Sequence, residues 1–225
     1  MNFAQFRCFH CEKPLAITSH GFCCRCYQQL PITPYCGQCG SILLENSIGC
    51  GNCIKDEPKW DRFLQICWYK APLNHWIADF KFHQKYDLDN ALARLLLLAV
   101  KNAQREHSLL LPEVIIPVPL HWKRHFKRGY NQAELLAIPL AKWLNIPCDT
   151  QSLTRIRHTQ PQRELSAKER RHNLKKAFCY QPIKHYRRVA VIDDVVTTGS
   201  TINAICCELR KQGVKEIQVW ALCRA

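Results

Sequence analysis

The segment Val189–Thr201 constrains the fold of this chain more than any other stretch of the sequence. It begins with an apolar run, passes through two carboxylates into a hydroxyl-rich turn, and reaches Gly199 just before a helical pattern over Ile202–Lys211. An uninterrupted apolar run is typical of a parallel strand that is buried on both faces. The segment therefore predicts a strand, a tight turn and a helix in an open α/β sheet.

The polar residues of this segment stand where open α/β sheets bind their ligands. Asp193 and Asp194 follow the apolar run, at the carboxyl end of the predicted strand. Carboxylates accept hydrogen bonds from sugar hydroxyls, and the unpaired N–H groups at a helix N-terminus bind phosphate. Gly199 allows the backbone to come close to such a ligand. These residues predict a pocket for a ribose 5-phosphate. The alternative interpretation is an ordinary strand–turn–helix with polar residues at its exposed end.

The same segment resembles the phosphoribosyl pyrophosphate (PRPP) signature of type I phosphoribosyltransferases. The resemblance implies that PRPP binds with Mg²⁺, that the two aspartates hold the ribose hydroxyls, and that the turn wraps the 5-phosphate. Purine-salvage members of that superfamily carry an aspartate in place of Thr197, whereas orotate-type enzymes carry threonine. A threonine has no accessible pKa for general base work, so the residues leave enzymatic turnover open. The implied ligand residues are Asp193, Asp194, Thr197, Thr198, Gly199, Ser200 and Thr201.

Four Cys-x-x-Cys pairs occupy the first 58 residues. A structural zinc ion takes four ligands in tetrahedral geometry, and each such pair supplies two of them. The segment has few large apolar side chains, so metal binding must support its folding. The pattern resembles a double zinc ribbon with two structural Zn²⁺, and disulfides, a redox pair or an iron–sulfur cluster are the alternatives. The expected ligands are Cys8, Cys11, Cys23, Cys26, Cys36, Cys39, Cys50 and Cys53.

The order of the cysteines bears on how they share the two metal ions. We expect sequential pairing, with the first four cysteines around one ion and the last four around the other, and a cross-braced arrangement is the alternative. Cys24 lies inside a pair and is not expected to be a ligand. The other six cysteines are expected to be buried apolar residues: Cys67, Cys148, Cys179, Cys206, Cys207 and Cys223.

The charge balance of the chain points to polyanionic partners. The formal net charge is +14, and it falls to about +10 when eight thiolates and two Zn²⁺ are counted. Such a balance favours nucleic acid, a nucleotide or pyrophosphate as a partner. The sequence has no apolar stretch of about 18 residues that would span a membrane, and its start lacks a signal-peptide pattern. We therefore expect a cytoplasmic protein without membrane insertion.

Strand and helix patterns alternate after residue 58. This alternation predicts that residues 59–225 form one α/β domain with a mostly parallel sheet and flanking helices. Strands are expected over 63–69, 114–118, 153–156, 189–194 and 216–222, and helices over 74–82, 88–103, 132–144 and 202–211. Pro139 is expected to kink or divide the helix that contains it.

Two basic segments complete the expected site. In the phosphoribosyltransferase layout the loop after an earlier strand binds pyrophosphate, and here its interleaved aromatic residues also suit stacking on single-stranded DNA. A solvated surface loop is the third interpretation. The candidates in this loop are Trp122, Lys123, Arg124, Phe126, Lys127 and Arg128. The resemblance implies a mobile lid over the later segment 155–173, which could equally bind nucleic acid. Its candidates for neutralising the leaving group are Arg163, Lys168, Arg170 and Arg171.

The order of these motifs along the chain resembles the competence protein F (ComF/GntX) family. The resemblance rests on the cysteine pairs, the stretches 116–120 and 128–132, the Arg-rich stretch 155–173 and the signature turn. It implies a type I phosphoribosyltransferase-like fold and a role in DNA uptake during natural transformation. Three hypotheses stay open at this point: a PRPP-dependent transferase that releases pyrophosphate, a factor that handles single-stranded DNA, and a nucleotide sensor without turnover. DNA-uptake or recombination proteins are the partners expected for such a chain.

Overall fold

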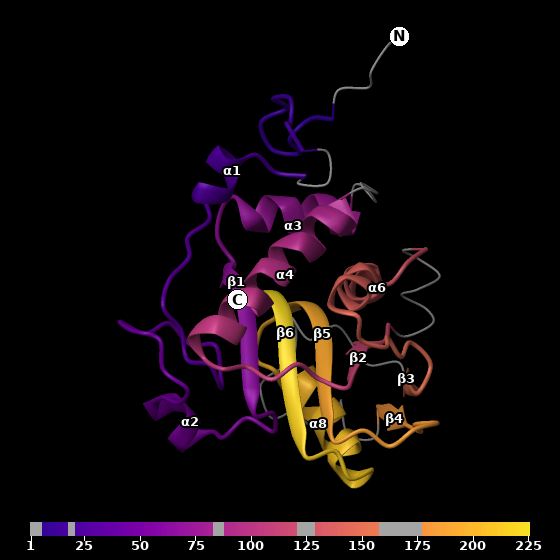
Figure 1. Ribbon diagram of the computed structural model, residues 1–225. Coiled ribbons are helices and arrows are strands. Elements are labelled where there is room, and N and C mark those ends of the chain that lie inside the picture. The colour runs from indigo at the N-terminus through magenta and orange to yellow at the C-terminus, as the bar shows by residue number, and fades with distance from the viewer. Residues whose placement is uncertain (1–5, 18–20, 83–87, 121–128, 158–176) are drawn as a thin grey trace.

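The computed structural model describes residues 6–17, 21–82, 88–120, 129–157 and 177–225 (Figure 1). Its centre is a parallel sheet of four strands in the order β1–β6–β5–β2. The strands are β1 (Arg62–Trp68), β2 (Val114–Pro117), β5 (Arg188–Val196) and β6 (Glu216–Arg224). All four were predicted from their apolar runs, and the structure confirms them. The parallel sheet with flanking helices also confirms the expected fold class.

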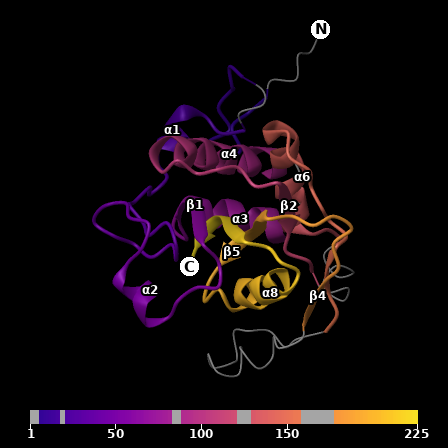
Figure 2. The same ribbon diagram turned by 60° about the horizontal axis from the view of Figure 1, so that its bottom comes forward.

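The strands are apolar throughout because both faces of the sheet are covered by helices (Figure 2). Ala190 and Ile192 point into the core formed with α3, α4 and α6, whereas Val189 and Val191 point into the core formed with α8. Successive residues of a strand face opposite sides, so a doubly covered strand needs apolar residues at every position. The helices are α3 (Leu73–Phe82), α4 (Leu88–Glu106), α6 (Gln132–Leu144) and α8 (Ser200–Lys211).

Three sequence expectations about this domain need correction. The helix α6 runs through Pro139 as one element, so the proline does not divide it. A short antiparallel pair joins β3 (Leu153–Arg155) to β4 (Phe178–Tyr180), and β4 was not predicted because a three-residue strand shows no periodicity. Cys207 is exposed, and Cys148 and Cys179 are only partly buried, whereas burial was expected. Cys207 follows the buried Cys206 on α8, and adjacent helix positions point in different directions.

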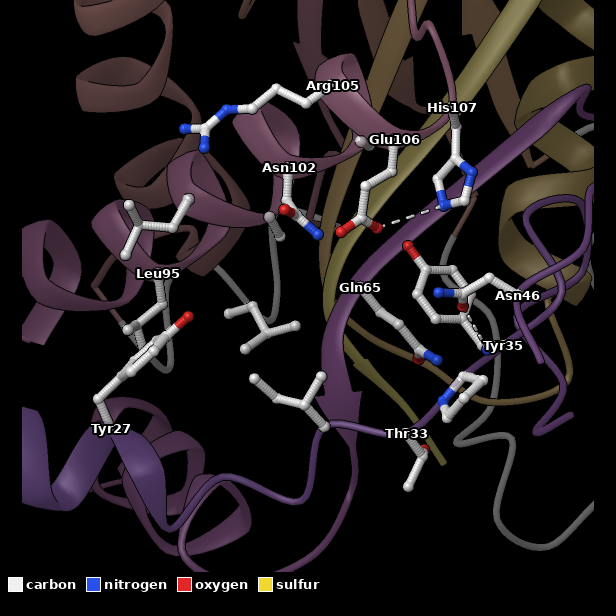
Figure 3. A pocket seen from close by; sticks show the side chains of 16 residues that line it. Tyr27, Thr33, Tyr35, Asn46, Gln65, Leu95, Asn102, Arg105, Glu106 and His107 are labelled. Carbon is white, nitrogen blue, oxygen red and sulfur yellow. Dashed lines mark hydrogen bonds and ion pairs between the residues drawn. The ribbon is translucent and has the colours of Figure 1, made fainter. Parts of the chain in front are cut away.

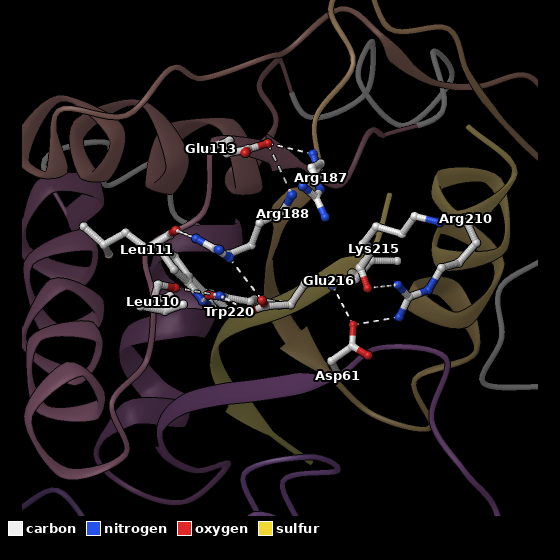
Figure 4. A network of polar contacts seen from close by, with 12 residues as sticks. Asp61, Leu110, Leu111, Glu113, Arg187, Arg188, Arg210, Lys215, Glu216 and Trp220 are labelled. Carbon is white, nitrogen blue, oxygen red and sulfur yellow. Dashed lines mark hydrogen bonds and ion pairs between the residues drawn. The ribbon is translucent and has the colours of Figure 1, made fainter. Parts of the chain in front are cut away.

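Ion pairs close the sheet at the amino ends of its strands (Figure 4). Asp61 accepts hydrogen bonds from the Arg210 guanidinium at the end of α8 and from the Ile217 N–H of β6, both at 2.7 Å. The Arg188 Nε of β5 lies 3.0 Å from a Glu216 carboxylate oxygen of β6. These contacts fix the first residues of the strands to one another and to α8. The carboxyl ends, where ligands bind in this type of sheet, lie at the opposite edge.

The cysteine-rich head consists of two short helices, α1 (Cys24–Gln28) and α2 (Gly51–Lys55), and two cysteine turns. Each helix begins one residue after a cysteine, Cys23 or Cys50. The first half of the head packs into the core of α3 and α4, where Phe22 stacks on Trp76 with ring centroids 3.9 Å apart. The cysteines of the second half form a small buried cluster of their own.

Candidate ligand and metal sites

The signature turn lies at the carboxyl end of β5 and leads directly into α8. Gly199 is the residue before the helix and has a left-handed backbone conformation with φ 72°, which glycine adopts without strain. The Thr198 and Ser200 hydroxyls are 2.9 Å apart, and the Gly199 carbonyl accepts a hydrogen bond from the Asn203 N–H at 2.8 Å. The turn lines a cavity of about 170 Å³ at the first turn of α8. Amides at this helix end suit a phosphate.

The acidic pair stands beside this turn and is joined there by a cation from another helix. Asp194 is buried, and its carboxylate lies 2.8 Å from the Lys81 ammonium of α3. Asp193 lines the cavity and is partly exposed there. Burial of its carboxyl group and then the negative charge of Asp194 raise the pKa of Asp193 to about 7, while the charge of Lys81 acts in the opposite direction. The oxygens of the two carboxyl groups can accept hydrogen bonds from hydroxyl groups of a ligand.

A second cavity of about 200 Å³ adjoins the first and shares Arg155, Asp193 and Thr201 with it. Asn131 is buried at its wall, where its side chain caps α6 by accepting from the Ala133 N–H at 3.1 Å and donates to the Val118 carbonyl at 3.1 Å. The joined cavities thus contain carboxylates, helix N–H groups and cations, which are the groups that bind a sugar phosphate.

The structure places the sequence-predicted residues of this site as follows. Asp193, Thr197, Gly199, Ser200 and Thr201 line the first cavity, Asp194 lines the second, and Thr198 is exposed beside them. The basic and aromatic loop 121–128 and the lid candidates at 163–171 lie outside the described residues.

Three residues of the site were missed by the sequence reasoning: Lys81, Asn131 and Arg155. Asn131 and Arg155 carried a signal, since they belong to the stretches 128–132 and 155–173 that supported the family resemblance. Lys81 reaches the site from α3, an element distant in the sequence. No periodicity or spacing of the sequence marks such a residue.

The eight predicted zinc ligands form two groups in the described part of the chain. One contains Cys8, Cys11, Cys23 and Cys26, and the other contains Cys36, Cys39, Cys50 and Cys53; the sulfur atoms within each group lie within 4.8 Å of one another. This grouping confirms the sequential pairing. Cys24 belongs to neither group and is exposed.

The sulfur spacing fits a tetrahedral zinc ion. Four sulfurs at about 2.3 Å from one Zn²⁺ would lie about 3.8 Å apart. The observed separations are 3.6 Å for Cys11–Cys23, 3.5 Å for Cys39–Cys50 and 3.8 Å for Cys50–Cys53. Each group has four thiol ligands and no fifth donor among the described residues, so the geometry suits closed, structural sites.

Another hollow lies away from the candidate site. A hollow of about 450 Å³ lies between α4 and the linker of the head, beside Tyr35, Asn102 and His107, and none of the sequence-predicted ligand residues lines it (Figure 3). None of the described helices combines the length and apolar content needed to cross a bilayer.

Comparisons with known proteins agree with the resemblance seen in the sequence. The chain is 53% identical over 228 residues to competence protein F of Haemophilus influenzae, covering 100% of both chains. It is 41% identical over 218 residues to the DNA utilization protein YhgH of Escherichia coli O157:H7, covering 96% of both. Among solved structures it resembles a glutamine PRPP amidotransferase from B. subtilis with 20% identity and a TM-score of 0.39, over 61% of this chain and 26% of that one. No family model matches the chain.

Proposed function

Because this chain belongs to the competence protein F family, we propose that it acts in DNA uptake and use, with a pocket for PRPP or a phosphoribosyl nucleotide. One observation supports this ligand: the pair of Asp193 and Asp194, of which Asp194 forms an ion pair with Lys81, lies beside the Gly199 turn at the start of α8. A ribose 5-phosphate presents two adjacent hydroxyls and one phosphate, and this edge of the sheet offers partners for both.

The polar groups of the pocket suit the binding of a ribose and its phosphate. Asp193 and Asp194 would accept hydrogen bonds from the ribose hydroxyls, and the turn 197–201 would donate its amides and hydroxyls to the 5-phosphate. Mg²⁺ would enter with the diphosphate, since it is usually held by one or two carboxylates together with substrate phosphates. Among the described residues no further carboxylate or histidine joins the two aspartates in a cation site.

The head would hold two structural zinc ions in its two cysteine groups. Each thiolate set supplies all four ligands, so the metal contributes folding energy and offers no open position for chemistry. We propose on this basis that residues 1–58 are the metal-dependent part of the chain and that residues 59–225 are the ligand-binding domain, both in the cytoplasm.

Single-stranded DNA is the second proposed ligand. The net charge, about +10 with eight thiolates and two Zn²⁺ counted, and the basic segment with Trp122 and Phe126 support it, because base stacking on aromatic residues combined with phosphate contacts binds unpaired strands. The names of the relatives, a competence protein and DNA utilization proteins, agree with such a ligand. DNA-uptake or recombination proteins would be its partners in that role.

Calorimetry on the full-length, zinc-loaded protein tests the pocket. We expect ribose 5-phosphate and PRPP with Mg²⁺ to bind the wild type and Asp194→Ala to lose roughly tenfold or more in affinity, or about 1.4 kcal/mol. Glu45→Ala, which removes an exposed carboxylate of the head, serves as the matched control and should bind as the wild type does. Equal binding by both variants would contradict the proposed site.

Two further measurements separate the functions. Pyrophosphate release from labelled PRPP, with and without single-stranded DNA, distinguishes a transferase from a binding protein. Titration with labelled oligonucleotides at several salt concentrations should show tighter binding of single strands than of duplex and a Trp122→Ala loss of roughly 1–3 kcal/mol. If single strands bind no better than heparin, the DNA-binding part of the proposal is wrong.

A further inference from the structure

The indole of Trp60 supports the signature turn from beneath. A Cβ atom placed on Gly199 would lie 2.5 Å from the Trp60 Cη2 atom and 3.2 Å from its Cζ3 atom. The ring therefore touches the backbone of the residue just before α8, and Trp60 itself is buried. Gly199 has two roles as a result: it adopts a left-handed conformation, and it leaves room for this ring.

The other end of the indole is fixed by the second cysteine turn. The Trp60 Nε1–H donates to the Gln38 carbonyl at 2.6 Å, and Gln38 lies between the sulfur ligands Cys36 and Cys39. The neighbouring carbonyls of Gly37 and Gly40 accept from the Phe63 N–H at 2.6 Å and the Gln65 amide at 3.3 Å. Three carbonyls of one metal-binding turn thus bind the start of β1.

The residues on both sides of Trp60 also contact α8. The Lys59 N–H donates to the Asn203 side chain at 2.9 Å, in the first turn of the helix. Asp61 pairs with Arg210 in its last turn at 2.7 Å. Lys59 and Asp61 therefore contact the first and last turns of α8, and Trp60 between them contacts the residue before the helix. A displacement of the Gln38 carbonyl would be passed to the phosphate-binding end of this helix.

We propose that Trp60 is a positioning residue for the signature turn, and that the metal ion in the group of Cys36, Cys39, Cys50 and Cys53 holds it in place through the Gln38 carbonyl. Zinc occupancy of this group then sets the affinity of the ligand pocket, although none of its cysteines lines that pocket. The effect on ligand affinity rests on the proposed function. The effect of Trp60 on the position of the signature turn does not. A misplacement of about 1 Å is enough to weaken a preorganised site.

Hydrogen exchange at residues 199–203 of the full-length protein tests the structural part, and it is read at the Asn203 N–H, which donates to the Gly199 carbonyl at 2.8 Å. The amides before Asn203 begin the helix and have no intrahelical acceptor. Trp60→Phe removes the indole donor and the outer ring that touches Gly199, and it should speed exchange there roughly tenfold. Trp76→Phe is the matched control. Trp76 is equally buried and also donates to a residue between two cysteine ligands, His10, at 3.1 Å. We expect it to leave exchange at 199–203 unchanged.

A second variant tests the metal without touching Trp60. Cys50→Ser should reduce zinc to one ion per chain by metal analysis and speed exchange at 199–203 as Trp60→Phe does. Unchanged exchange at 199–203 in both variants, with β5 and β6 still protected, would overturn the inference.

Ribose 5-phosphate affinity then separates the two proposals. We expect a loss of about tenfold in both Trp60→Phe and Cys50→Ser. If the wild type does not bind ribose 5-phosphate, the proposed function fails while the exchange result still decides the role of Trp60. If the wild type binds and both variants bind equally well, the link between metal and ligand is wrong.

Discussion

The cysteine turns at Cys8–Cys11 and Cys36–Cys39 repeat the same backbone pattern in two different settings. In the first, the Glu12 N–H donates to the Cys8 carbonyl at 2.9 Å, and in the second the Gly40 N–H donates to the Cys36 carbonyl at 2.7 Å. Glu12 and Gly40 both have a positive φ, of 58° and 79°. A short bridge flanks each turn, Arg7 with Pro14 in one and Tyr35 with Ile42 in the other.

The settings of the two turns differ in what packs on them. Cys8 and Cys26 of the first group lie in the large core of α3 and α4, whereas Cys36, Cys39 and Cys53 of the second group bury mainly one another. The second turn contacts the rest of the chain through backbone carbonyls that reach Trp60, Phe63 and Gln65. The local sequence thus determines the backbone of each turn and its cysteine ligands. The packing determines which other parts of the chain each turn stabilises.

The largest expected effect separates the two groups directly. Cys8→Ser removes a ligand that is also part of the large core, so we expect it to destabilise the whole chain by more than roughly 4 kcal/mol, as loss of a metal in a core does. Cys53→Ser should release its metal but leave α3 and α4 protected. Hydrogen exchange of α4 together with zinc content measures both. Equal loss of protection in α4 would show that the two settings do not differ.

The second prediction concerns the left-handed residue that ends the second turn. A Cβ atom on Gly40 would lie 2.6 Å from the Phe63 ring, so Gly40→Ala adds an overpacked contact to the strain of a positive φ. We expect a loss of about 2–4 kcal/mol in the free energy of unfolding, measured with urea. Gly49→Ala is the control, because nothing lies within 4 Å of the added atom there.

A smaller effect is expected for the contact between α3 and the acidic pair. The helix α3 carries Trp76, which contacts the first turn, and Lys81, which pairs with Asp194. The charge of Lys81 lowers the pKa of Asp193, so Lys81→Met should raise that pKa above about 7 and weaken ribose 5-phosphate binding at neutral pH. We expect a change of roughly 1 kcal/mol, or about fivefold in affinity.

Titration of ribose 5-phosphate binding against pH checks this expectation, with the exposed Lys211→Met of α8 as the control. The pH at which binding rises should move upward in Lys81→Met only.

The raised pKa of Asp193 also determines how the free energy of unfolding changes with pH. The folded chain keeps a proton on Asp193 that the unfolded chain has lost, so stability falls as the pH rises from about 4 to about 7. Asp193→Asn should remove that fall.

The smallest expected effect is at Glu12. Glu12→Gly relieves the strain of a positive φ, about 1 kcal/mol, but glycine gains nearly as much conformational freedom in the unfolded chain. The free energy of unfolding should change by less than about 0.5 kcal/mol in urea. A loss as large as that of Gly40→Ala would mean that the turn itself, and not the Phe63 contact, makes the second turn sensitive to substitution.

The sequence predicted what local patterns encode. The apolar runs of β1, β2, β5 and β6 predicted the sheet, and the four Cys-x-x-Cys pairs predicted both cysteine groups, with sequential pairing as the expected arrangement. Lys81 and Trp60 were not predicted, because each reaches the site only through the tertiary fold, and Arg155 was not singled out within the Arg-rich stretch that it opens. The contact of Trp60 with Gly199 joins residues of the first and last thirds of the chain, and no periodicity marks it.

The position of β6 has a consequence for how the chain forms during synthesis. This strand follows the other three in sequence but lies between β1 and β5, pairing with both. Until it leaves the ribosome, β1 has no partner among the described strands, whereas the eight cysteines of the two groups emerged long before. Domains form from the N-terminus during translation at about 5–20 residues per second. Both cysteine groups are therefore synthesised seconds before the sheet closes, so a metal ion that they bind can reach the nascent chain earlier than the proposed ligand of the β5 edge can.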